Sequence, residues 1–478
     1  MNITEEKLME AISEITGYDQ CDFSKADKLI EDLGFDSIML MDLWGCFPDN
    51  TGSTNMELLK NILSNDATVE ELMRLFGINA ELFPKEVCII DEFPEVVEFL
   101  EYYESVKEKA PYFRRNDGVP RNIMSIEGNE KINYSTYNYL GLNGDMRINA
   151  YVKEAVDRYG TSVSGSRLLS GQIELHEKLE RKIASFLGVD DALAEVGGHS
   201  TNVNTIGNLV SEADLILHDA LAHNSIIQGC ILSHAKRKPF KHNNMEHLES
   251  ELKKLRKKFR RVLIVVEGVY SMDGDICNLP ELIRLKKEYG AILMVDEAHS
   301  FGTIGECGKG VTSYYNVEPK DVDILMGTLS KAAASCGGYI AGNRNFIKYL
   351  RYNSPGFIFS CGLTPANTAA AYKAIEMFEE EPERFENLRN NSTYFLDEVK
   401  KLGFDTGASS DTPIISIIIG NSQKALDLSN ELFEMGINAL PIVYPAVKEN
   451  EARIRFFMSA NHTLEEINKT LTTLQKFC

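Results

Sequence analysis

Between residues 112 and 364, short apolar runs alternate with segments that have the 3.6-residue period of helices. The runs of strand length lie at 193–196, 215–217, 262–266, 292–295, 324–326 and 339–341. Strands that alternate with helices are joined by crossovers, which place the strands parallel in one sheet with helices on its faces. The alternation therefore predicts an α/β fold with a largely parallel sheet.

The pattern changes after residue 364. A long helix is followed there by three strand-like runs, at 413–419, 439–442 and 453–458, and by a final helix. This order of elements is typical of a smaller α+β domain. We therefore predict a large domain over about 151–364 and a small domain formed by 112–150 together with 365–478.

The first 111 residues are organised differently. Residues 1–80 have short amphipathic patterns separated by a long loop, which predict a small all-α helical bundle. Residues 81–111 carry three prolines around an acidic helical pattern at 95–109. This composition indicates a connector between two folded parts.

Acidic residues are concentrated in these first segments. Of the formal net charge of −21, residues 1–80 contribute −11 and residues 81–109 contribute −6. A nucleic-acid binder needs a basic footprint that neutralises phosphates, so this distribution argues against nucleic-acid binding. It favours a front module that contacts a basic surface.

The sequence also bears on the presence of membrane spans, a signal peptide and cysteine motifs. The chain has no apolar run of roughly 18 residues, and its start lacks the basic and apolar regions of a signal peptide. We therefore expect a cytoplasmic protein without a membrane span. The nine cysteines include no C-x-x-C pair, so the sequence predicts neither a disulfide framework nor a metal site.

A serine occupies a distinctive position in the front module. Ser37 follows Gly34-Phe35-Asp36 at the start of a predicted helix, where unpaired amides stabilise a phosphodiester. An ordinary Asp-Ser helix cap explains these residues equally well. The acidic composition, size and motif of residues 1–77 resemble an acyl carrier protein. This resemblance implies that Ser37 carries 4′-phosphopantetheine, with an acyl group as a thioester.

A carboxylate and a lysine follow neighbouring predicted strands. Asp296 ends the run at 292–295, and Lys331 comes just past the run at 324–326. In a parallel sheet both positions fall at the carboxyl edge, where ligands bind. Either residue alone has an ordinary explanation, a helix cap or a solvated lysine. Together they favour pyridoxal 5′-phosphate, which needs a lysine for a Schiff base and a carboxylate beside the pyridine nitrogen.

Four small or polar residues fit the phosphate of the same cofactor. Gly198 and His199 follow a strand and open a helix, where backbone amides can cradle a phosphate. Thr328 and Ser330 offer hydroxyl groups just before the lysine. We expect these two segments to face each other.

Two further residues point to ring and substrate binding. His223 is placed to lie over the pyridine ring, although an ordinary half-buried histidine has the same pattern. Arg455 is a charge among core residues of a predicted strand. A bidentate pair with a substrate carboxylate is the role that best explains it.

Seven blocks of residues 112–478 resemble the α-oxoamine synthase family of fold-type I pyridoxal-phosphate enzymes, serine palmitoyltransferases above all. The blocks lie, in the family's order, at 137–142, 165–171, 176–180, 267–275, 296–299, 328–331 and 359–360. The resemblance implies that Lys331 is the Schiff-base lysine, that Asp296 is the pyridinium partner and that His299 lies near the phenolic oxygen.

The same resemblance implies roles for four more residues. Ser271 resembles a hydroxyl near the cofactor, and His223 resembles the histidine that stacks on the ring. Arg455 resembles the clamp for the substrate carboxylate. Ser360 resembles a residue that reaches the phosphate of the other subunit, which implies a homodimer with shared sites.

The chain departs from the family pattern at three positions. Tyr137 stands where the biotin-pathway and haem-pathway members have asparagine and the sphingolipid members have tyrosine. Val443 lies near the position of an additional arginine in bacterial serine palmitoyltransferases. His199 replaces a usual aromatic residue and can stack in its place.

The resemblance implies a decarboxylative condensation. Glycine, alanine or serine reacts with an acyl thioester, and an α-amino ketone leaves. We expect the thioester to be held on Ser37, which implies phosphopantetheinyl transferase and acyl-loading partners. The basic run at 253–261 offers a docking surface for the acidic carrier, although a solvated helix face explains that run as well.

Three alternatives stay open at this point. The protein can be a coenzyme A-dependent serine palmitoyltransferase or 8-amino-7-oxononanoate synthase whose carrier domain is not loaded. It can be a pyridoxal-phosphate aminotransferase of the same fold. It can also be a carrier or scaffold without enzymatic activity.

Overall fold

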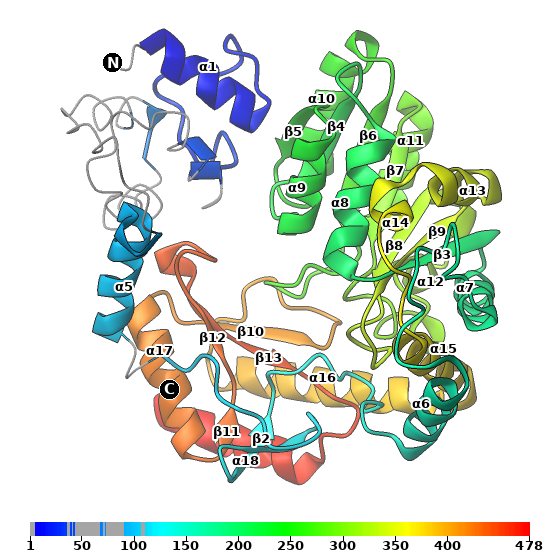
Figure 1. The fold of residues 1–478 in the computed structure, drawn as a ribbon. Helices are drawn as coiled ribbons and strands as arrows, with labels where there is room; N and C mark the ends of the chain where they lie inside the picture. Colours follow the sequence, from blue (N-terminus) through cyan, green and yellow to red (C-terminus); the bar gives the residue numbers. More distant parts are fainter. Residues whose placement is uncertain are drawn as a thin grey trace.

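The computed structural model describes residues 5–35, 39, 40, 42, 43, 67–69, 72, 90–106 and 110–478. Ser37 lies outside these residues, so its placement at a helix start stays a prediction. The described chain contains the front module, a helix at 94–106 and a larger part with one seven-stranded sheet and two three-stranded sheets (Figure 1). Within it, no helix is long and apolar enough to cross a membrane.

An apolar cluster holds the front module together. Helix α1 (Glu5–Thr16) puts Leu8, Ile12 and Ile15 on one face, because residues three and four apart share a face of a helix. The face packs on buried residues from later in the module, which are Phe23, Leu29, Leu33, Phe35, Met39, Leu40, Leu43, Val69 and Leu72. The connector follows with a short 3-10 helix, Ile90–Glu92, and helix α5 (Pro94–Val106).

The large domain is built on a seven-stranded sheet with the strand order β3-β9-β8-β7-β6-β4-β5. The strands are β3 (Asp191–Glu195), β4 (Leu215–Asp219), β5 (Lys236–Phe240), β6 (Val262–Glu267), β7 (Ile292–Asp296), β8 (Ile324–Thr328) and β9 (Gly338–Gly342). Strand β9 is antiparallel to β3 and β8, and the other neighbours are parallel. The predicted largely parallel sheet is confirmed.

Both faces of this sheet are buried. In β6, Val262, Ile264 and Val266 join one apolar cluster, whereas Leu263 and Val265 join another on the opposite face. One face is covered by α8 (Gly198–Leu209), α9 (Asn224–Leu232), α13 (Arg344–Asn353) and α14 (Pro355–Ile358). The other is covered by α7 (Glu174–Leu187), α10 (Met245–Leu255), α11 (Leu279–Tyr289) and α15 (Pro365–Glu380).

Strand β5 has no counterpart among the predicted strands. Its sequence is Lys-Arg-Lys-Pro-Phe, which lacks an apolar run, yet Arg237 and Lys238 are buried. The strand forms the edge of the sheet, and β4 is its partner there. Proline is tolerated at such an edge because no ladder bond on the outer side is lost.

The small domain holds two three-stranded sheets. One has the order β1-β2-β11 and the other has the order β10-β13-β12. The strands are β1 (Ile123–Ile126), β2 (Asn129–Asn133), β10 (Ile414–Ile418), β11 (Ile437–Asn438), β12 (Pro441–Ile442) and β13 (Arg453–Phe457). The helices are α16 (Glu383–Lys401), α17 (Ser422–Glu434) and α18 (Leu464–Leu474), while α6 (Met146–Tyr159) packs on α15.

Short helices complete the chain. They are η3 (Arg256–Lys258), η4 (Glu306–Gly308), α12 (Val311–Tyr314), η5 (Pro319–Asp321), η6 (Glu449–Glu451) and η7 (Gln475–Phe477). The first of them follows α10 directly in the chain and precedes β6.

Candidate active site

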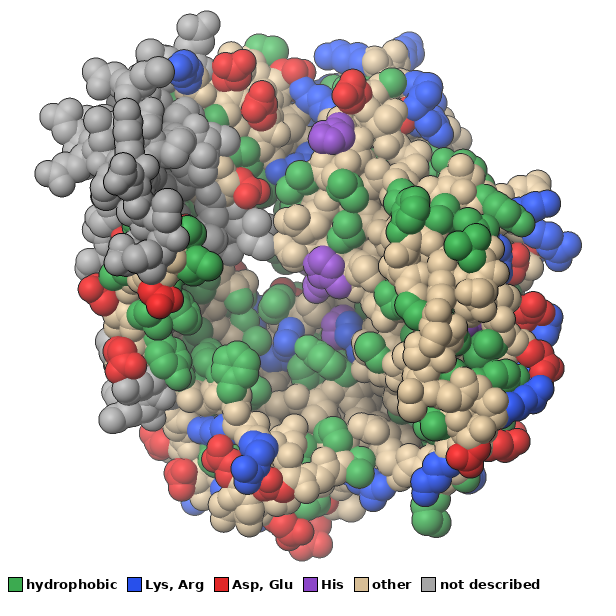
Figure 2. All heavy atoms as spheres, viewed as in Figure 1, with side chains coloured by type: hydrophobic (Ala, Val, Ile, Leu, Met, Phe, Trp, Pro, Cys, Tyr) green, Lys and Arg blue, Asp and Glu red, His purple; other side chains and the backbone are tan. Residues whose placement is uncertain are grey.

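The parallel strands bring polar residues to one edge of the sheet. Asp219, Glu267, Asp296 and Thr328 are the last residues of β4, β6, β7 and β8. The strand register places Glu267 directly beside Asp296. In Figure 2, histidine and basic side chains are visible inside a hollow near the middle of the face shown.

Lys331 lies three residues past the end of β8 and is half-buried. Burial lowers the pKa of Lys331 to about 8, although the charges of Asp296 and Glu267 act in the opposite direction. Its Nζ lies 5.5 Å from the centre of the Tyr137 ring. The neutral amine, which a nucleophile or base requires, is therefore more populated near neutral pH than in an ordinary lysine.

Asp296 is buried at the end of β7 and is held by two donors. Its Oδ2 accepts a hydrogen bond from Asn202 Nδ2 at 2.7 Å, and its Oδ1 accepts one from the Ala298 amide at 2.9 Å. Asn202 lies four residues after Gly198, on the same face of α8, and that spacing is the sequence signal that could have identified it. The two bonds fix the direction in which the carboxylate points.

Two histidines lie near the N-terminus of α9. His223 is the N-cap of this helix, and its backbone amide donates to Glu267 Oε1 at 2.7 Å. Burial lowers the pKa of His223, so its ring stays neutral near pH 7. The exposed His199 ring lies 6.3 Å from the His223 ring in an edge-on arrangement. Glu267, a residue without a predicted role, thus positions His223.

His299 is buried in the segment that follows β7. Its Nδ1 lies 2.9 Å from Tyr139 Oη, and its ring is stacked on Phe457 with the centres 6.3 Å apart. Burial, followed by the charges of Lys331 and Arg455, holds the pKa of His299 well below its usual value. The ring is therefore a neutral hydrogen-bonding group.

Small and hydroxyl residues form a cradle at the start of α8. A Cβ at Gly198 would lie 2.7 Å from Thr328 Oγ1, so only glycine lets the helix start approach this hydroxyl closely. Thr328 Oγ1 is 2.7 Å from Ser330 Oγ. The free amides of the α8 N-terminus and these hydroxyls are a donor set suited to a phosphate group.

Arg455 projects from the middle strand of the small domain toward the large domain. Its Nη1 donates to the Ser271 carbonyl at 2.8 Å, and the guanidinium lies 4.6 Å from the centre of the Phe457 ring. Its Nε is buried and has no hydrogen-bond partner among the described residues. A buried donor of this kind needs an acceptor, and a substrate carboxylate supplies one.

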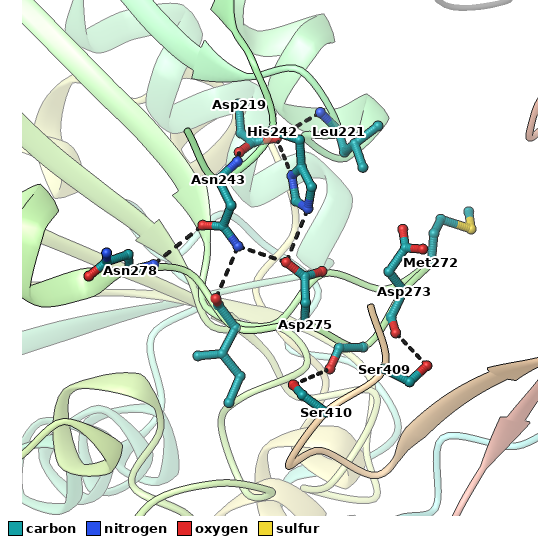
Figure 3. Close-up of polar contacts among 12 residues, drawn as sticks. Asp219, Leu221, His242, Asn243, Met272, Asp273, Asp275, Asn278, Ser409 and Ser410 are labelled. Carbon is teal, nitrogen blue, oxygen red and sulfur yellow. Dashed lines mark hydrogen bonds and ion pairs between the residues drawn. The ribbon is translucent and has the colours of Figure 1, made fainter. Parts of the chain in front are cut away.

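One histidine joins the end of β4 to the segment that follows β6. His242 contacts Asp219 at 2.8 Å through Nδ1 and Asp275 at 3.0 Å through Nε2 (Figure 3). Asn243 donates to Asp275 at 2.7 Å, and the Tyr270 ring meets the His242 ring edge-on at 4.6 Å. No sequence pattern indicates this network, because its members lie far apart in the chain and carry no motif.

The structure brings ten of the predicted residues together at the carboxyl edge of the sheet. They are Gly198, His199, His223, Ser271, Asp296, His299, Thr328, Ser330, Lys331 and Arg455. Ser360 lies between α14 and α15 and makes no hydrogen bond to this cluster among the described residues. Its proposed contact with a second subunit stays a prediction.

Comparisons with known proteins agree with this geometry. The family model described as aminotransferase class I and II matches residues 129–474, and the model described as phosphopantetheine attachment site matches residues 6–74. The chain therefore belongs to the class I and II aminotransferase family of pyridoxal-phosphate enzymes and carries a phosphopantetheine attachment domain in front. Both the predicted transferase class and the predicted carrier domain are confirmed.

The relatives belong to a narrower group within that family. An 8-amino-7-oxononanoate synthase from Thermoanaerobacter pseudethanolicus is 42% identical over 75% of this chain and 89% of the relative. A serine palmitoyltransferase from Sphingobacterium spiritivorum is 38% identical over 77% and 92%. The solved serine palmitoyltransferase from S. paucimobilis superposes with a TM-score of 0.77 and 28% identity, over 81% of this chain and 98% of that one. The chain is similar to both kinds of enzyme.

The residues of the site fit the cofactor of this family. A solved serine palmitoyltransferase similar to this chain contains pyridoxal phosphate. The cradle at Gly198 offers donors for the phosphate, and the fixed carboxylate of Asp296 suits a protonated ring nitrogen. Asn202 Oδ1 and Arg455 Nε are buried polar atoms left without partners among the described residues. The site is thus incomplete without a polar ligand.

Proposed function

We propose that the protein condenses a small amino acid with an acyl group carried on its own Ser37-linked phosphopantetheine. The carbon–sulfur bond of the thioester breaks, a carbon–carbon bond forms at the α-carbon, and the amino acid loses its carboxyl group as carbon dioxide. The α-carbon regains a proton, and an α-amino ketone leaves. Glycine, alanine and serine are the proposed amino acids, since these are the range of the α-oxoamine synthase family that the chain resembles.

Each residue of the site has a separate role in this reaction. Pyridoxal phosphate, when bound, withdraws electrons from the α-carbon of the amino acid. Arg455 binds the carboxylate of the amino acid through its unpartnered Nε. Hydrogen bonds from Asn202 and the Ala298 amide orient the carboxylate of Asp296 for the ring nitrogen. Lys331, whose pKa burial lowers to about 8, takes the α-proton as a neutral amine. His223, neutral and oriented by Glu267, supplies an apolar ring face with a fixed orientation.

One observation supports the proposal that the acyl donor is bound to the carrier domain. The phosphopantetheine attachment model matches residues 6–74 of the same chain whose residues 129–474 match the enzyme family. A donor tethered to the enzyme reaches an effective concentration of up to the order of millimolar, which a free thioester seldom has. Selection for such a concentration explains why the two parts are fused.

The test uses the full chain in its holo form. We expect protein loaded with an acyl chain to release product and carbon dioxide with one of the three amino acids, and the Ser37→Ala variant to give none from the same loading mixture. A Ser53→Ala variant controls for a serine loss elsewhere in the front module. Equal product from Ser37→Ala and wild type, both supplied with acyl-coenzyme A, together with no product from loaded wild type, contradicts the carrier-bound donor.

Transamination is the second candidate, because the matching family model bears the aminotransferase name. It converts the amino acid to a keto acid and releases no carbon dioxide. Measuring labelled carbon dioxide from carboxyl-labelled amino acid separates the two reactions directly.

A further inference from the structure

The front module rests on the edge strand β5. The Arg237 guanidinium donates to the Ile15 carbonyl at the end of α1 and lies 3.9 Å from Met39 Sδ. The backbone at Gly17 approaches the Arg237 carbonyl so closely that a Cβ there would overlap it, and a Cβ at Gly34 would lie 2.9 Å from Pro239. Close backbone approach of this kind indicates a fitted contact rather than a loose encounter.

Opposite charges face each other across this contact. Lys236 Nζ lies 2.5 Å from Asp19, and Lys238 Nζ lies 3.6 Å from Asp22 and 4.4 Å from the centre of the Tyr18 ring. Hydrogen bonding and charge from Lys236 lower the pKa of Asp19 below its usual value. The basic strand therefore meets the acidic module with complementary charges.

The small domain takes part in the same contact. Tyr444 is buried within the apolar cluster of the front module, although it belongs to the segment after β12. Lys28 lowers the pKa of Glu31 through a hydrogen bond, and Lys448 of the small domain contributes a smaller effect through its charge. The module therefore touches both catalytic domains.

The predicted docking run at 253–261 is mostly engaged elsewhere. Lys253 pairs with Glu249 and Lys254 with Glu251, while Arg260 and Arg261 both pair with Asp214. Arg256 donates to the carbonyls of 259, 289 and 290. Only the charge of Lys258 reaches Asp19 among the described interactions of this run. The pairing within this run fits the alternative of a solvated helix face, and the described contacts with the front module come mainly from β5.

The contacted elements are direct neighbours of those that form the site. Strand β5 pairs with β4, which ends at Asp219 and leads into the loop of His223. The segment of Tyr444 follows β12, and β12 pairs with β13, which carries Arg455. A module resting on β5 and Tyr444 therefore sits one strand away from each side of the site.

We propose that the β5 edge, with Lys236, Arg237 and Lys238, and the Tyr444 segment form a docking surface for the chain's own carrier module, and that the acyl group is delivered from this docked position. The docking part stands on the contacts alone, whereas the delivery part rests on the proposed function. Charge complementarity at the rim of such a contact determines which carrier docks.

The test first reverses charges on the carrier side alone. Asp19→Lys with Asp22→Lys removes the two ion pairs with Lys236 and Lys238 described above. Glu10→Lys with Glu14→Lys is the matched control, since both residues are exposed in the same module and the change in net charge is identical. Adding Lys236→Glu to Asp19→Lys recreates one pair with its polarity reversed.

Amide hydrogen exchange and single turnovers are the two measurements. We expect faster exchange at 15–35 and 236–240 in the docking variant, about a tenfold or greater loss of turnover from the Ser37-loaded form, and unchanged turnover with added acyl-coenzyme A. The swapped pair recovers part of the loss, and the control matches wild type. Exchange equal to that of the control overturns the docking surface.

Two further results separate the docking and delivery parts. Faster exchange with unchanged turnover of the loaded form overturns delivery from the docked position. If loaded wild type yields no more product than Ser37→Ala while the exchange difference persists, the proposed donor is wrong and the docking surface stands.

Discussion

His242 provides a stability prediction that follows from its two carboxylate partners. Burial disfavours a charged imidazole, but the hydrogen bonds to Asp219 and Asp275 outweigh burial and raise the pKa of His242 to about 10. A group whose pKa is raised by folding stabilises the fold fully below its unfolded pKa of about 6.5. That contribution is lost as the pH rises through about 10.

The magnitude follows from the same shift. A tenfold change in proton affinity is worth about 1.36 kcal/mol, so the shift from 6.5 to about 10 sets an upper value near 5 kcal/mol. Removing one partner from a buried charged pair costs about 3–5 kcal/mol. We therefore expect His242→Gln to lower the free energy of unfolding by about 3 kcal/mol at pH 6, and by about 1 kcal/mol or less at pH 10.

Urea unfolding of the holoenzyme at pH 6, 8 and 10 measures this difference. The exposed His234, changed to glutamine, is the matched control, and we expect its effect to stay within about 0.5 kcal/mol at each pH. A destabilisation by His242→Gln that is the same at pH 6 and pH 10 refutes the reasoning, because it shows that the imidazole is uncharged in the fold.

Four further outcomes test the site. Lys331→Ala lowers kcat by about 10²–10⁴-fold, measured as product per loaded protein with thermal unfolding as the control for folding. Arg455→Lys raises the KM for the amino acid by about tenfold and leaves the KM for the thioester within about twofold, because lysine cannot form the bidentate pair with the amino-acid carboxylate. Asn202→Leu weakens pyridoxal phosphate binding by about tenfold, measured by cofactor release, since Asp296 loses one of its two donors. The rate at which apo-protein takes up pyridoxal phosphate rises with pH through about 8 and then levels, because the neutral Lys331 amine is the reactive form; a rate independent of pH between 7 and 9 contradicts the lowered pKa.

The strands of the main sheet were predictable where they are buried on both faces. In β6 all six residues are buried, and the first five, Val262 to Val266, form an unbroken apolar run. Strand β5 escaped prediction because its polar residues are covered by a module that is distant in the sequence, and periodicity carries no information about such contacts. For the same reason, the sequence could offer the basic run at 253–261 as a docking surface but could not point to β5.

The site was predictable where one residue type has one chemical task. Lys331 and Asp296 were found because each follows a strand whose carboxyl end lies at the ligand-binding edge. Asn202 and Glu267 act only through a partner, and their roles depend on distances of 2.7 Å that no spacing rule specifies. Ser37 lies outside the described residues, so the sequence motif and the family match at 6–74 are its support.

The cover over β5 also has a consequence for handling the protein. An open strand edge invites pairing with a second copy, and proteins protect such edges with proline, with charge or with a covering element. Here β5 contains a proline, Pro239, and a charged residue, Lys236, and the front module covers the strand. Cutting the chain at its connector uncovers Tyr444 and the buried Arg237 together with this edge. We therefore expect the truncated catalytic part to self-associate when it is concentrated. The carrier domain then also keeps the enzyme in solution.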